Sequence, residues 1–424
     1  MRHFYTLMWC LALPLVLLRL WWRGRKEPGY RQHWRERLGF YGARSAGGHT
    51  LWVHAVSVGE TRAAEPLVDA LLLAYPESRI VLTHMTPTGR ATGRALFARH
   101  GDRLLQAYLP YDIPFMVRRF IKHFAPRICI LIETEVWPNL IHACGERVPV
   151  ALVNARLSAR SLRRGQRFGT LMTDAARALA LVAAQTDADA GRVRSLGAPR
   201  VEVTGSVKFD VQVPAQALDS GATLRAQIGA RPVLLCASTR EGEEALILDA
   251  CAPLFQLPGN ALLMIVPRHP QRFDDVAAMV AARGLAVQRR SALTGSDAGV
   301  DPATQVLLGD SMGEMFAYFA ACDLAFIGGS LLELGGQNLI EACALGKPVL
   351  VGPHTFNFAL VTEEAITFGA ALCVADSTEL VASAIDLLVD DTRRAAMGEL
   401  ALAFAQHHRG ATARTVGLLR HIIF

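Results

Sequence analysis

The feature that most constrains the fold is an alternation of short apolar runs with amphipathic stretches, which begins after residue 48. Strands that alternate with helices form parallel sheets with right-handed crossovers. Stretches such as residues 62–74 and 115–124 have the periodicity of helices. The apolar runs predict strands at residues 51–56, 79–83, 128–132, 150–154, 180–184 and 201–203.

A second series of runs predicts strands at residues 233–237, 262–266, 305–308, 324–327 and 348–351. Between the two series, residues 210–219 contain a proline and lack an amphipathic period, so we place the linker there. The 424 residues are also too many for one ordinary domain. The sequence therefore predicts two Rossmann-like α/β domains facing a cleft, with boundaries at 24–212 and 213–424.

Residues 1–23 form a separate segment, which is almost wholly apolar from residue 4 to residue 22 apart from Arg19. About 20 apolar residues are needed to span a bilayer. Basic residues follow at positions 23, 25 and 26, and no small-residue cleavage site is present. We expect a signal-anchor that is single-pass or deeply anchored in the inner membrane, with the domains on the cytoplasmic side. A helix that lies in the membrane interface is the alternative.

The net charge of +6 comes from residues 1–45, which contain nine Lys/Arg and only two acidic residues, because acidic and basic residues nearly balance in the rest of the chain. Nucleic-acid binding needs a basic face on a folded domain, so no nucleic-acid partner is expected. Basic residues beside an apolar segment suit membrane lipids instead. The eight cysteines contain no Cys-x-x-Cys pair and are predicted to be buried hydrophobes in a reducing compartment.

Acidic residues follow two of the predicted strands. Glu60 comes after a glycine at a strand-to-helix turn, where a helix dipole is expected to keep its carboxylate ionised as a general base. Simple charge complementarity with the helix N-terminus is the alternative. Glu133 and Glu135 follow the run at 128–132, and strand alternation predicts that they point to the same side. Solvent-facing positions in a loop are the alternative for this pair.

Arginines with interleaved serines follow the run at 150–154, and their forked side chains suit phosphate recognition. A solvated basic helix face explains the same spacing. The candidates are Arg156, Arg160, Arg163 and Arg164.

The second half places several polar or glycine-rich segments at predicted strand ends. Glycines at 328–329 and 335–336 would let the backbone approach a ligand, and the helix opening at Asn338 suits a phosphate. Asn338 with Glu341 also fits a capping box. Arg268 and His269 end another strand, Lys208 precedes the linker, and residues 309–315 contain Met312, Gly313 and Glu314. Several such strand ends together predict a site for an anionic donor.

No metal site is predicted. Asp187 and Asp189 spell the Asp-x-Asp of some metal-dependent glycosyltransferases, but they precede a helical stretch and fit N-terminal capping better. The histidines form no metal-ligand cluster, and neither a P-loop nor a dinucleotide fingerprint is present.

Taken in order, these motifs resemble the 3-deoxy-D-manno-octulosonic acid (Kdo) transferases over nearly the whole chain. The likeness rests on HAVSVGE ending at Glu60, TPTG from Thr86, LPYD from Leu109, ETEVWPN from Glu133, NARLS from Asn154, Lys208, PRHP from Pro267, GDSMGEM from Gly309, the helix start at 338–341 and GPHTFNF from Gly352. The family usually has His where this chain has Arg240 and Gln337.

The resemblance implies a GT-B fold and a metal-independent, inverting transfer of Kdo from CMP-Kdo to a lipid A precursor (lipid IVA) in lipopolysaccharide biosynthesis, without a cofactor. It implies an acceptor-binding N-terminal domain and a nucleotide-sugar-binding C-terminal domain. Glu60 would accept the proton, while Glu133 and Lys208 would stabilise the transition state. The residues implied to hold CMP are Arg268, His269, Met312, Gly313, Glu314, Asn338, Leu339, Ile340 and Glu341.

Three other readings stay open. The first is another GT-B enzyme that uses a UDP-sugar, or a sugar-nucleotide epimerase of that fold. The second is a membrane-tethered binding protein without catalytic activity. The third is a dehydrogenase, against which the missing dinucleotide fingerprint counts.

Overall fold

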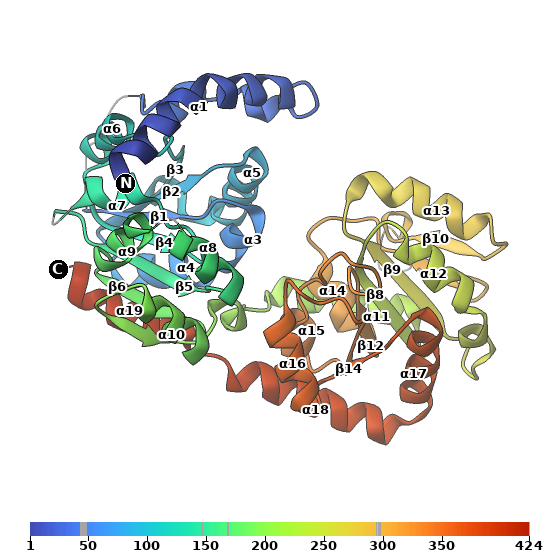
Figure 1. Ribbon diagram of the computed structural model, residues 1–424. Coiled ribbons are helices and arrows are strands. Elements are labelled where there is room, and N and C mark those ends of the chain that lie inside the picture. Colours follow the sequence, from blue (N-terminus) through green and yellow to red (C-terminus); the bar gives the residue numbers. More distant parts are fainter. Residues whose placement is uncertain (43–48, 146, 168, 294, 296–297, 424) are drawn as a thin grey trace. The chain divides into compact units, whose positions relative to one another are not determined.

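The computed structural model describes residues 1–42, 49–145, 147–167, 169–293, 295 and 298–423. The chain forms two compact units, one made of residues 1–210 with 409–424 and one made of residues 211–408 (Figure 1). We expected the second domain to run from 213 to 424. Residues 409–424 belong instead to the first unit, because their helix buries its apolar residues there.

The first unit contains a seven-stranded sheet whose strands are all parallel, in the order β3-β2-β1-β4-β5-β6-β7. Six strands confirm the predicted ones to within two residues at each end. The exception is β3, which lies at the sheet edge and whose apolar run is interrupted by Gln106. The strands are β1 (His49–His54), β2 (Ser78–His84), β3 (Leu104–Tyr108), β4 (Pro126–Ile132), β5 (Val150–Ala155), β6 (Leu181–Ala184) and β7 (Val201–Val203).

Helices cover both faces of this sheet, because alternate residues of its strands enter two different cores. Leu51 and Val53 of β1 pack in one core with α4 and α19, whereas Trp52 packs in the other with α6 and α7. The helices of this unit are α1 (Arg2–Arg23), η1 (Pro28–Arg31), α2 (Trp34–Arg37), α3 (Val58–Ala63), α4 (Glu65–Ala74), α5 (Pro87–Leu96), η2 (Ala98–Arg103), α6 (Pro114–Phe124), α7 (Pro138–Cys144), α8 (Ala159–Arg167), α9 (Thr170–Arg177), α10 (Asp187–Ser195), η3 (Val207–Asp210) and α19 (Ala411–Ile423).

The second unit repeats the plan with a parallel sheet in the order β10-β11-β9-β8-β12-β13-β14. The five predicted strands are confirmed to within two residues at each end. The short edge strands β10 and β14 were not predicted. The strands are β8 (Val233–Thr239), β9 (Leu262–Pro267), β10 (Val287–Arg289), β11 (Val306–Leu308), β12 (Leu324–Ile327), β13 (Val349–Val351) and β14 (Ala371–Cys373).

Helices also surround the second sheet (Figure 1). The predicted linker at 210–219 is wrong beyond Pro214, because the first helix of this unit begins at the following residue. The helices are α11 (Ala215–Ile228), α12 (Glu243–Ala250), η4 (Ala252–Gln256), η5 (Pro270–Arg272), α13 (Phe273–Ala281), η6 (Arg290–Ala292), α14 (Met315–Ala321), α15 (Ile340–Ala344), α16 (Ala359–Thr367), α17 (Ser377–Val389) and α18 (Asp391–His407).

Each sheet has one topological switch point, where the chain changes the direction in which it adds strands. This point lies between β1 and β4 in the first unit and between β8 and β12 in the second. In open parallel sheets, ligands bind beyond the carboxyl ends of the strands at the switch point. The residues that follow β1, β4, β8 and β12 are therefore the first place to look for a site.

The first unit ends on a polar clamp between η3 and α19. The carboxylate of Asp210 accepts the backbone N–H groups of Gly410 and Thr412 at 2.6 and 2.5 Å. Beyond this clamp, Val416, Leu419 and Ile423 are buried in the core that also contains α4. The chain therefore leaves the first unit after Asp210, forms the whole second unit, and returns.

The N-terminal helix α1 is long and apolar enough to cross a membrane, but one side of it packs against the first unit. Trp9 lies against Tyr111 with ring centroids 5.8 Å apart, and Leu20 is buried. The hydroxyl of Thr6 and the side-chain amide of Asn139 lie within hydrogen-bond distance at 3.0 and 3.2 Å. The other side carries exposed apolar residues: Phe4, Leu7, Met8, Leu11, Leu15, Leu18 and Trp22.

The cysteine prediction holds for six of the eight side chains, which are buried. Cys10 and Cys373 are exposed.

Candidate active site

Glu60 lies in the first turn of α3, directly beyond the carboxyl end of β1. Ser57 caps this helix, since its Oγ accepts the N–H of Glu60 at 3.4 Å. The Glu60 carboxylate returns toward the chain, with Oε2 accepting the N–H of Val56 at 2.7 Å and Oε1 accepting the Ser57 hydroxyl at 3.1 Å. This reciprocal arrangement is close to a capping box. It fixes the carboxylate in place and shows that a capping role is present.

The environment of Glu60 favours its neutral form more than we expected. Burial raises the pKa of Glu60 to about 7, against the lowering effect of the Val56 N–H, and the charges of Glu135 and Glu133 raise it further. The expectation that the helix dipole keeps this carboxylate ionised was wrong, because α3 is only six residues long and burial outweighs it. A carboxyl group that titrates near neutral pH suits a general base.

Glu133 and Lys208 form an ion pair beside this carboxylate. Glu133 follows β4, and its Oε1 lies 2.7 Å from Nζ of Lys208 in η3. Both residues lie beyond the end of β4 and Glu133 has a φ of 62°, so strand alternation does not set the direction of the Glu133 and Glu135 side chains. A positive φ at a non-glycine residue is strained and is often found at functional sites.

Glu135 completes a group of three carboxyl groups. Its Oε2 accepts the indole N–H of Trp137 at 2.8 Å. Burial raises the pKa of Glu135, the Trp137 hydrogen bond lowers it, and the charge of Glu133 raises it. The structure therefore brings Glu60, Glu133, Glu135 and Lys208 into one electrostatic environment at the switch point of the first sheet.

Two buried polar residues support this group, and the sequence alone did not assign them a role. Asn154 lies near the end of β5 with a φ of 54°, and its Oδ1 accepts the N–H of Val207, the residue before Lys208, at 3.3 Å. Asp112 accepts the N–H groups of Asn139 and Leu140 at 3.0 and 2.7 Å and so fixes the start of α7. Their position in the motifs NARLS and LPYD was the available signal.

The predicted arginine cluster lies on and before α8. Arg160, Arg163 and Arg164 are exposed, Arg156 is half-buried, and the described part of α8 has no buried residue. These side chains present a basic surface, which fits both the phosphate-binding and the solvated-helix reading.

Asp189 is used in local structure instead of being available to an ion. It accepts the N–H of Leu157 at 2.9 Å, pairs with Arg192 at 2.9 Å and accepts the Thr186 hydroxyl at 2.7 Å. Thr186 caps α10, so the capping interpretation of this segment is correct with Thr186 as the capping residue.

Three arginines, Arg240, Arg268 and Arg272, gather around His269 at the carboxyl ends of β8 and β9 in the second unit. Burial lowers the pKa of His269, and the positive charges of Arg240, Arg268 and Arg272 lower it further. Arg272 also pairs with the buried carboxylate of Glu244 at 3.0 Å. So much positive charge around one half-buried histidine makes this part of the sheet edge attractive to an anion.

The segment that follows β11 is held by its own polar contacts. The Ser311 hydroxyl donates to Glu314, and Glu314 pairs with Arg290 at 3.4 Å. Gly313 has a φ of 84°, and the side chain of Met312 is 63% exposed. Met312 is therefore free to contact a ligand, whereas Glu314 is already engaged.

The glycine-rich segments that follow β12 differ from the expectation. The N–H groups of Gly329, Ser330 and Leu331 are bonded to the carboxylate of Glu243, so they are not open to a ligand. Farther on, the side-chain oxygen of Asn338 accepts the N–H of Ile340 at 3.1 Å and its amide donates to Glu341 at 3.3 Å. The capping box foreseen for Asn338 and Glu341 is not formed, because the N-cap residue of α15 is Leu339 and it has no side-chain cap bond. Leu339 and Ile340 are buried.

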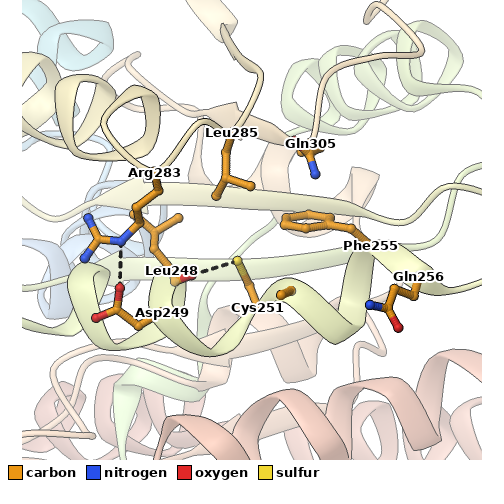
Figure 2. A pocket seen from close by; sticks show the side chains of 9 residues that line it. Leu248, Asp249, Cys251, Phe255, Gln256, Arg283, Leu285 and Gln305 are labelled. Atoms are coloured by element: carbon orange, nitrogen blue, oxygen red, sulfur yellow. Dashed lines mark hydrogen bonds and ion pairs between the residues drawn. The ribbon is translucent and has the colours of Figure 1, made fainter.

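An open cavity of about 480 Å³ lies elsewhere in the second unit (Figure 2). Its lining includes Phe255 and the ion pair between Asp249 and Arg283, whose nitrogen and oxygen lie 2.7 Å apart. Gln305 in the lining precedes β11, which places the cavity at the amino ends of the strands. The predicted site lies at the opposite ends, so this cavity is not part of it.

Comparison with known proteins agrees with these motifs. A family profile described as "3-Deoxy-D-manno-octulosonic-acid transferase (kdotransferase)" matches residues 32–211. The chain is 47% identical to a 3-deoxy-D-manno-octulosonic acid transferase of Bordetella pertussis, over 99% of this chain and 98% of that protein. It is 38% identical to the protein of the same name from Haemophilus influenzae, over 99% and 98% of the two chains.

Solved structures with the same architecture are more distant in sequence. A glycosyltransferase from Rickettsia africae matches with a TM-score of 0.59 and 12% identity over 89% of this chain and 99% of that chain. A UDP-GlcNAc 2-epimerase from Neisseria meningitidis matches with a TM-score of 0.58 and 16% identity over 88% and 100%. At such identities the likeness shows the fold alone, and it confirms the predicted GT-B class.

Proposed function

Because the chain belongs to the family of 3-deoxy-D-manno-octulosonic acid (Kdo) transferases, we propose that it transfers Kdo from CMP-Kdo to a lipid A precursor, lipid IVA. The enzyme is a glycosyltransferase of GT-B fold. What we propose is the identity of its donor, the identity of its acceptor and the membrane face on which it acts. The observation that carries the donor assignment is the group of Arg240, Arg268, His269 and Arg272. A CMP-linked sugar acid carries a phosphate and a carboxylate, and forked guanidinium groups bind both.

The chemical step is an inverting displacement. A hydroxyl oxygen of the acceptor attacks the anomeric carbon of Kdo while Glu60 takes the hydroxyl proton. The bond from that carbon to the phosphate oxygen breaks, and CMP leaves with the electron pair. A base that titrates near pH 7 is well matched to this proton transfer at neutral pH.

Lys208 and Glu133 act as a unit in this proposal. The positive charge of Lys208 would stabilise negative charge that develops on the departing phosphate, as preorganised cations do in other enzymes. Glu133 holds the ammonium group at 2.7 Å, and Asn154 fixes the backbone just before it. Lys208 and the arginines of the second unit would together supply the positive charge that a metal ion supplies in other glycosyltransferases.

We assign the acceptor to the first unit and the nucleotide to the second. Arg156, Arg160, Arg163 and Arg164 would bind anionic groups of the lipid. The nucleotide contacts would come from Arg268, His269, Met312, Gly313, Glu314, Asn338, Leu339, Ile340 and Glu341. Since Leu339 and Ile340 are buried, they would contribute only through the backbone.

The lipid acceptor requires a membrane location, and α1 is the proposed attachment. Its inner side is committed to the first unit through Thr6, Trp9 and Leu20. A helix that spans a bilayer would have to release these contacts. We therefore favour a helix that lies in the interface of the cytoplasmic membrane leaflet, with its exposed apolar side in the lipid and Arg19, Arg23 and neighbouring basic residues near the headgroups.

Two experiments test the proposal. The purified full-length chain is incubated with CMP-Kdo and lipid IVA, and the product mass is read. Addition of one or more Kdo units supports the donor and acceptor; turnover only with a UDP-sugar, or epimerisation of one, would favour the alternative GT-B activities. For the anchor, an impermeant reagent is applied to intact cells that carry an N-terminal label. An interfacial helix keeps the label protected, whereas a spanning helix exposes it.

A further inference from the structure

A buried carboxylate in the second unit lies between the loops of the switch point. Glu243 is the first residue of α12, and its side chain is completely buried. Its Oε2 accepts the N–H groups of Gly329 and Arg240 at 2.6 and 2.9 Å. Its Oε1 accepts the N–H groups of Ser330 and Leu331, both at 2.9 Å. Four backbone donors therefore converge on one carboxylate, two on each oxygen.

This carboxylate connects segments that follow different strands. Arg240 follows β8, whereas the other three donors follow β12, so Glu243 bridges the two strands that flank the switch point. The loop that follows β12 is in turn bonded to residues farther along the chain. The carbonyl of Gly329 accepts the N–H of Gly336, the Ser330 hydroxyl accepts the N–H of Gly352 at 2.8 Å, and the Ser330 carbonyl accepts the N–H of His354 at 2.9 Å.

The packing around the loop leaves it little freedom to adjust. A methyl group added at Gly328 would lie 2.6 Å from Cα of Thr239 and 2.7 Å from the carbonyl oxygen of Ser238. One added at Gly352 would lie 2.3 Å from the carbonyl oxygen of Ser330. The backbone at the end of β8 and the backbones that follow β12 and β13 are thus in direct contact, and the Glu243 carboxylate accepts the N–H groups at their centre.

We propose that Glu243 is a positioning residue for donor binding, which holds the loops after β8, β12 and β13 in the conformation that receives the nucleotide sugar. A buried carboxylate is unfavourable unless its oxygens are fully bonded, and here four N–H groups satisfy it. Glu243 fixes the backbone of Arg240, which is one of the arginines around His269. The loop that it holds is also bonded to Gly336, which lies two residues before Asn338. This inference rests on the proposed placement of the donor in the second unit.

The test replaces Glu243 by glutamine. The side chain keeps its size, but one oxygen becomes an NH₂ group that faces two N–H donors, so two hydrogen bonds are lost and the loop must move. We expect the Kd for CMP and the KM for the sugar donor to rise about 10- to 100-fold, by analogy with the loss of contacts that support the ligands of metal sites. The KM for the lipid acceptor should stay within about twofold, because the acceptor is assigned to the first unit.

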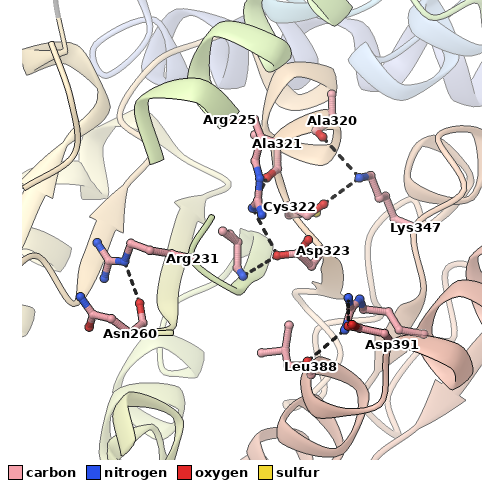
Figure 3. A network of polar contacts seen from close by, with 12 residues as sticks. Arg225, Arg231, Asn260, Ala320, Ala321, Cys322, Asp323, Lys347, Leu388 and Asp391 are labelled. Carbon is pink, nitrogen blue, oxygen red and sulfur yellow. Dashed lines mark hydrogen bonds and ion pairs between the residues drawn. The ribbon is translucent and has the colours of Figure 1, made fainter. Parts of the chain in front are cut away.

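A matched control makes the same chemical change at the other end of β8. Asp323 accepts the N–H of Val233 at 2.7 Å and pairs with Arg225 at 3.2 Å, at the amino end of that strand (Figure 3). Asp323→Asn should lower the free energy of unfolding while leaving the donor KM at the parental value. A donor KM that rises equally in both variants would mean that Glu243 acts through general stability, and the proposal would be wrong.

A second measurement does not depend on the identity of the ligand. Hydrogen exchange of the amides of residues 329–331 and 352–354 should accelerate in Glu243→Gln, while amides within β8 keep their protection. Unchanged exchange together with an unchanged donor KM overturns the inference.

If the parent chain does not bind CMP, the proposed function fails instead, and the exchange result still decides the role of Glu243. If Glu243→Gln does not fold, Glu243→Asp keeps the charge but shortens the reach; a folded Asp variant with parental donor KM also overturns it.

Discussion

The Glu60→Gln variant separates a general base from a helix cap. Glutamine keeps the size of the side chain and an oxygen that can accept the Val56 N–H, but it cannot take a proton. Loss of a general base lowers kcat by about 10²- to 10⁴-fold. A cap contributes about 1 kcal/mol to stability, and its loss would not reduce turnover of the folded enzyme.

The raised pKa of Glu60 gives the stability of this variant a definite sign. A carboxyl group whose pKa moves from 4.5 to about 7 in the folded state stabilises the fold below pH 4.5, and this contribution is lost as the pH rises through 7. The displacement corresponds to at most about 3 kcal/mol. Because glutamine resembles the neutral acid, the variant should match the parent at low pH and become more stable than it above pH 7, by up to that amount.

The assay measures kcat/KM against pH for both chains, with unfolding followed at pH 5 and pH 8. The parent should lose activity about tenfold per pH unit below pH 7, whereas the residual activity of the variant should not follow this titration. Glu135→Gln is the matched control, because removing its charge should lower the pKa of Glu60 and shift the acid limb to lower pH. Near-parental turnover by Glu60→Gln would refute the assignment and leave Glu133 or Glu135 as the base. A variant destabilised at every pH would instead identify Glu60 as a cap.

Three further outcomes are expected. Activity should survive EDTA, because Lys208 and the arginines provide the positive charge; loss that Mg²⁺ restores would direct attention to Asp187 and Asp189. Removal of residues 1–23 should abolish binding to anionic vesicles and also lower the Tm by several degrees, because the inner side of α1 covers Tyr111; an unchanged Tm would show that α1 does not pack there. Asp210→Asn should cost about 1–3 kcal/mol in the free energy of unfolding and increase hydrogen exchange in α19, since it weakens two N–H bonds; parental protection of α19 would contradict the clamp.

The sequence predicted the fold best where burial is strongest. The central strands are continuous apolar runs because both of their faces are covered, and such runs are easily read. The missed strands β3, β10 and β14 all lie at sheet edges, and polar residues such as Gln106 and Arg289 interrupt the apolar runs of β3 and β10. The sequence of α19 also does not indicate that this helix returns to the first unit, because its apolar spacing would allow it to pack on either sheet.

The sequence predicted which residues form the candidate site better than it predicted their protonation and hydrogen bonding. Acidic residues after apolar runs indicated Glu60 and Glu133, because the carboxyl ends of parallel strands meet at one edge. The pKa of Glu60 depends on burial and on two neighbouring carboxylates that only the fold brings close. The roles of Asn154 and Glu243 depend on bonds to backbone N–H groups of distant loops, and such bonds have no periodicity in the sequence.

The path of the chain through the Asp210 clamp has a consequence for biosynthesis. On the ribosome, residues 211–408 emerge as an uninterrupted block and can complete their fold, whereas the first unit lacks α19 until residues 409–424 have followed. Until then, the side of the sheet that packs with Val416, Leu419 and Ile423 is uncovered. The nascent first unit therefore exposes apolar surface for the whole time in which the second is made, which makes it the natural client of a chaperone.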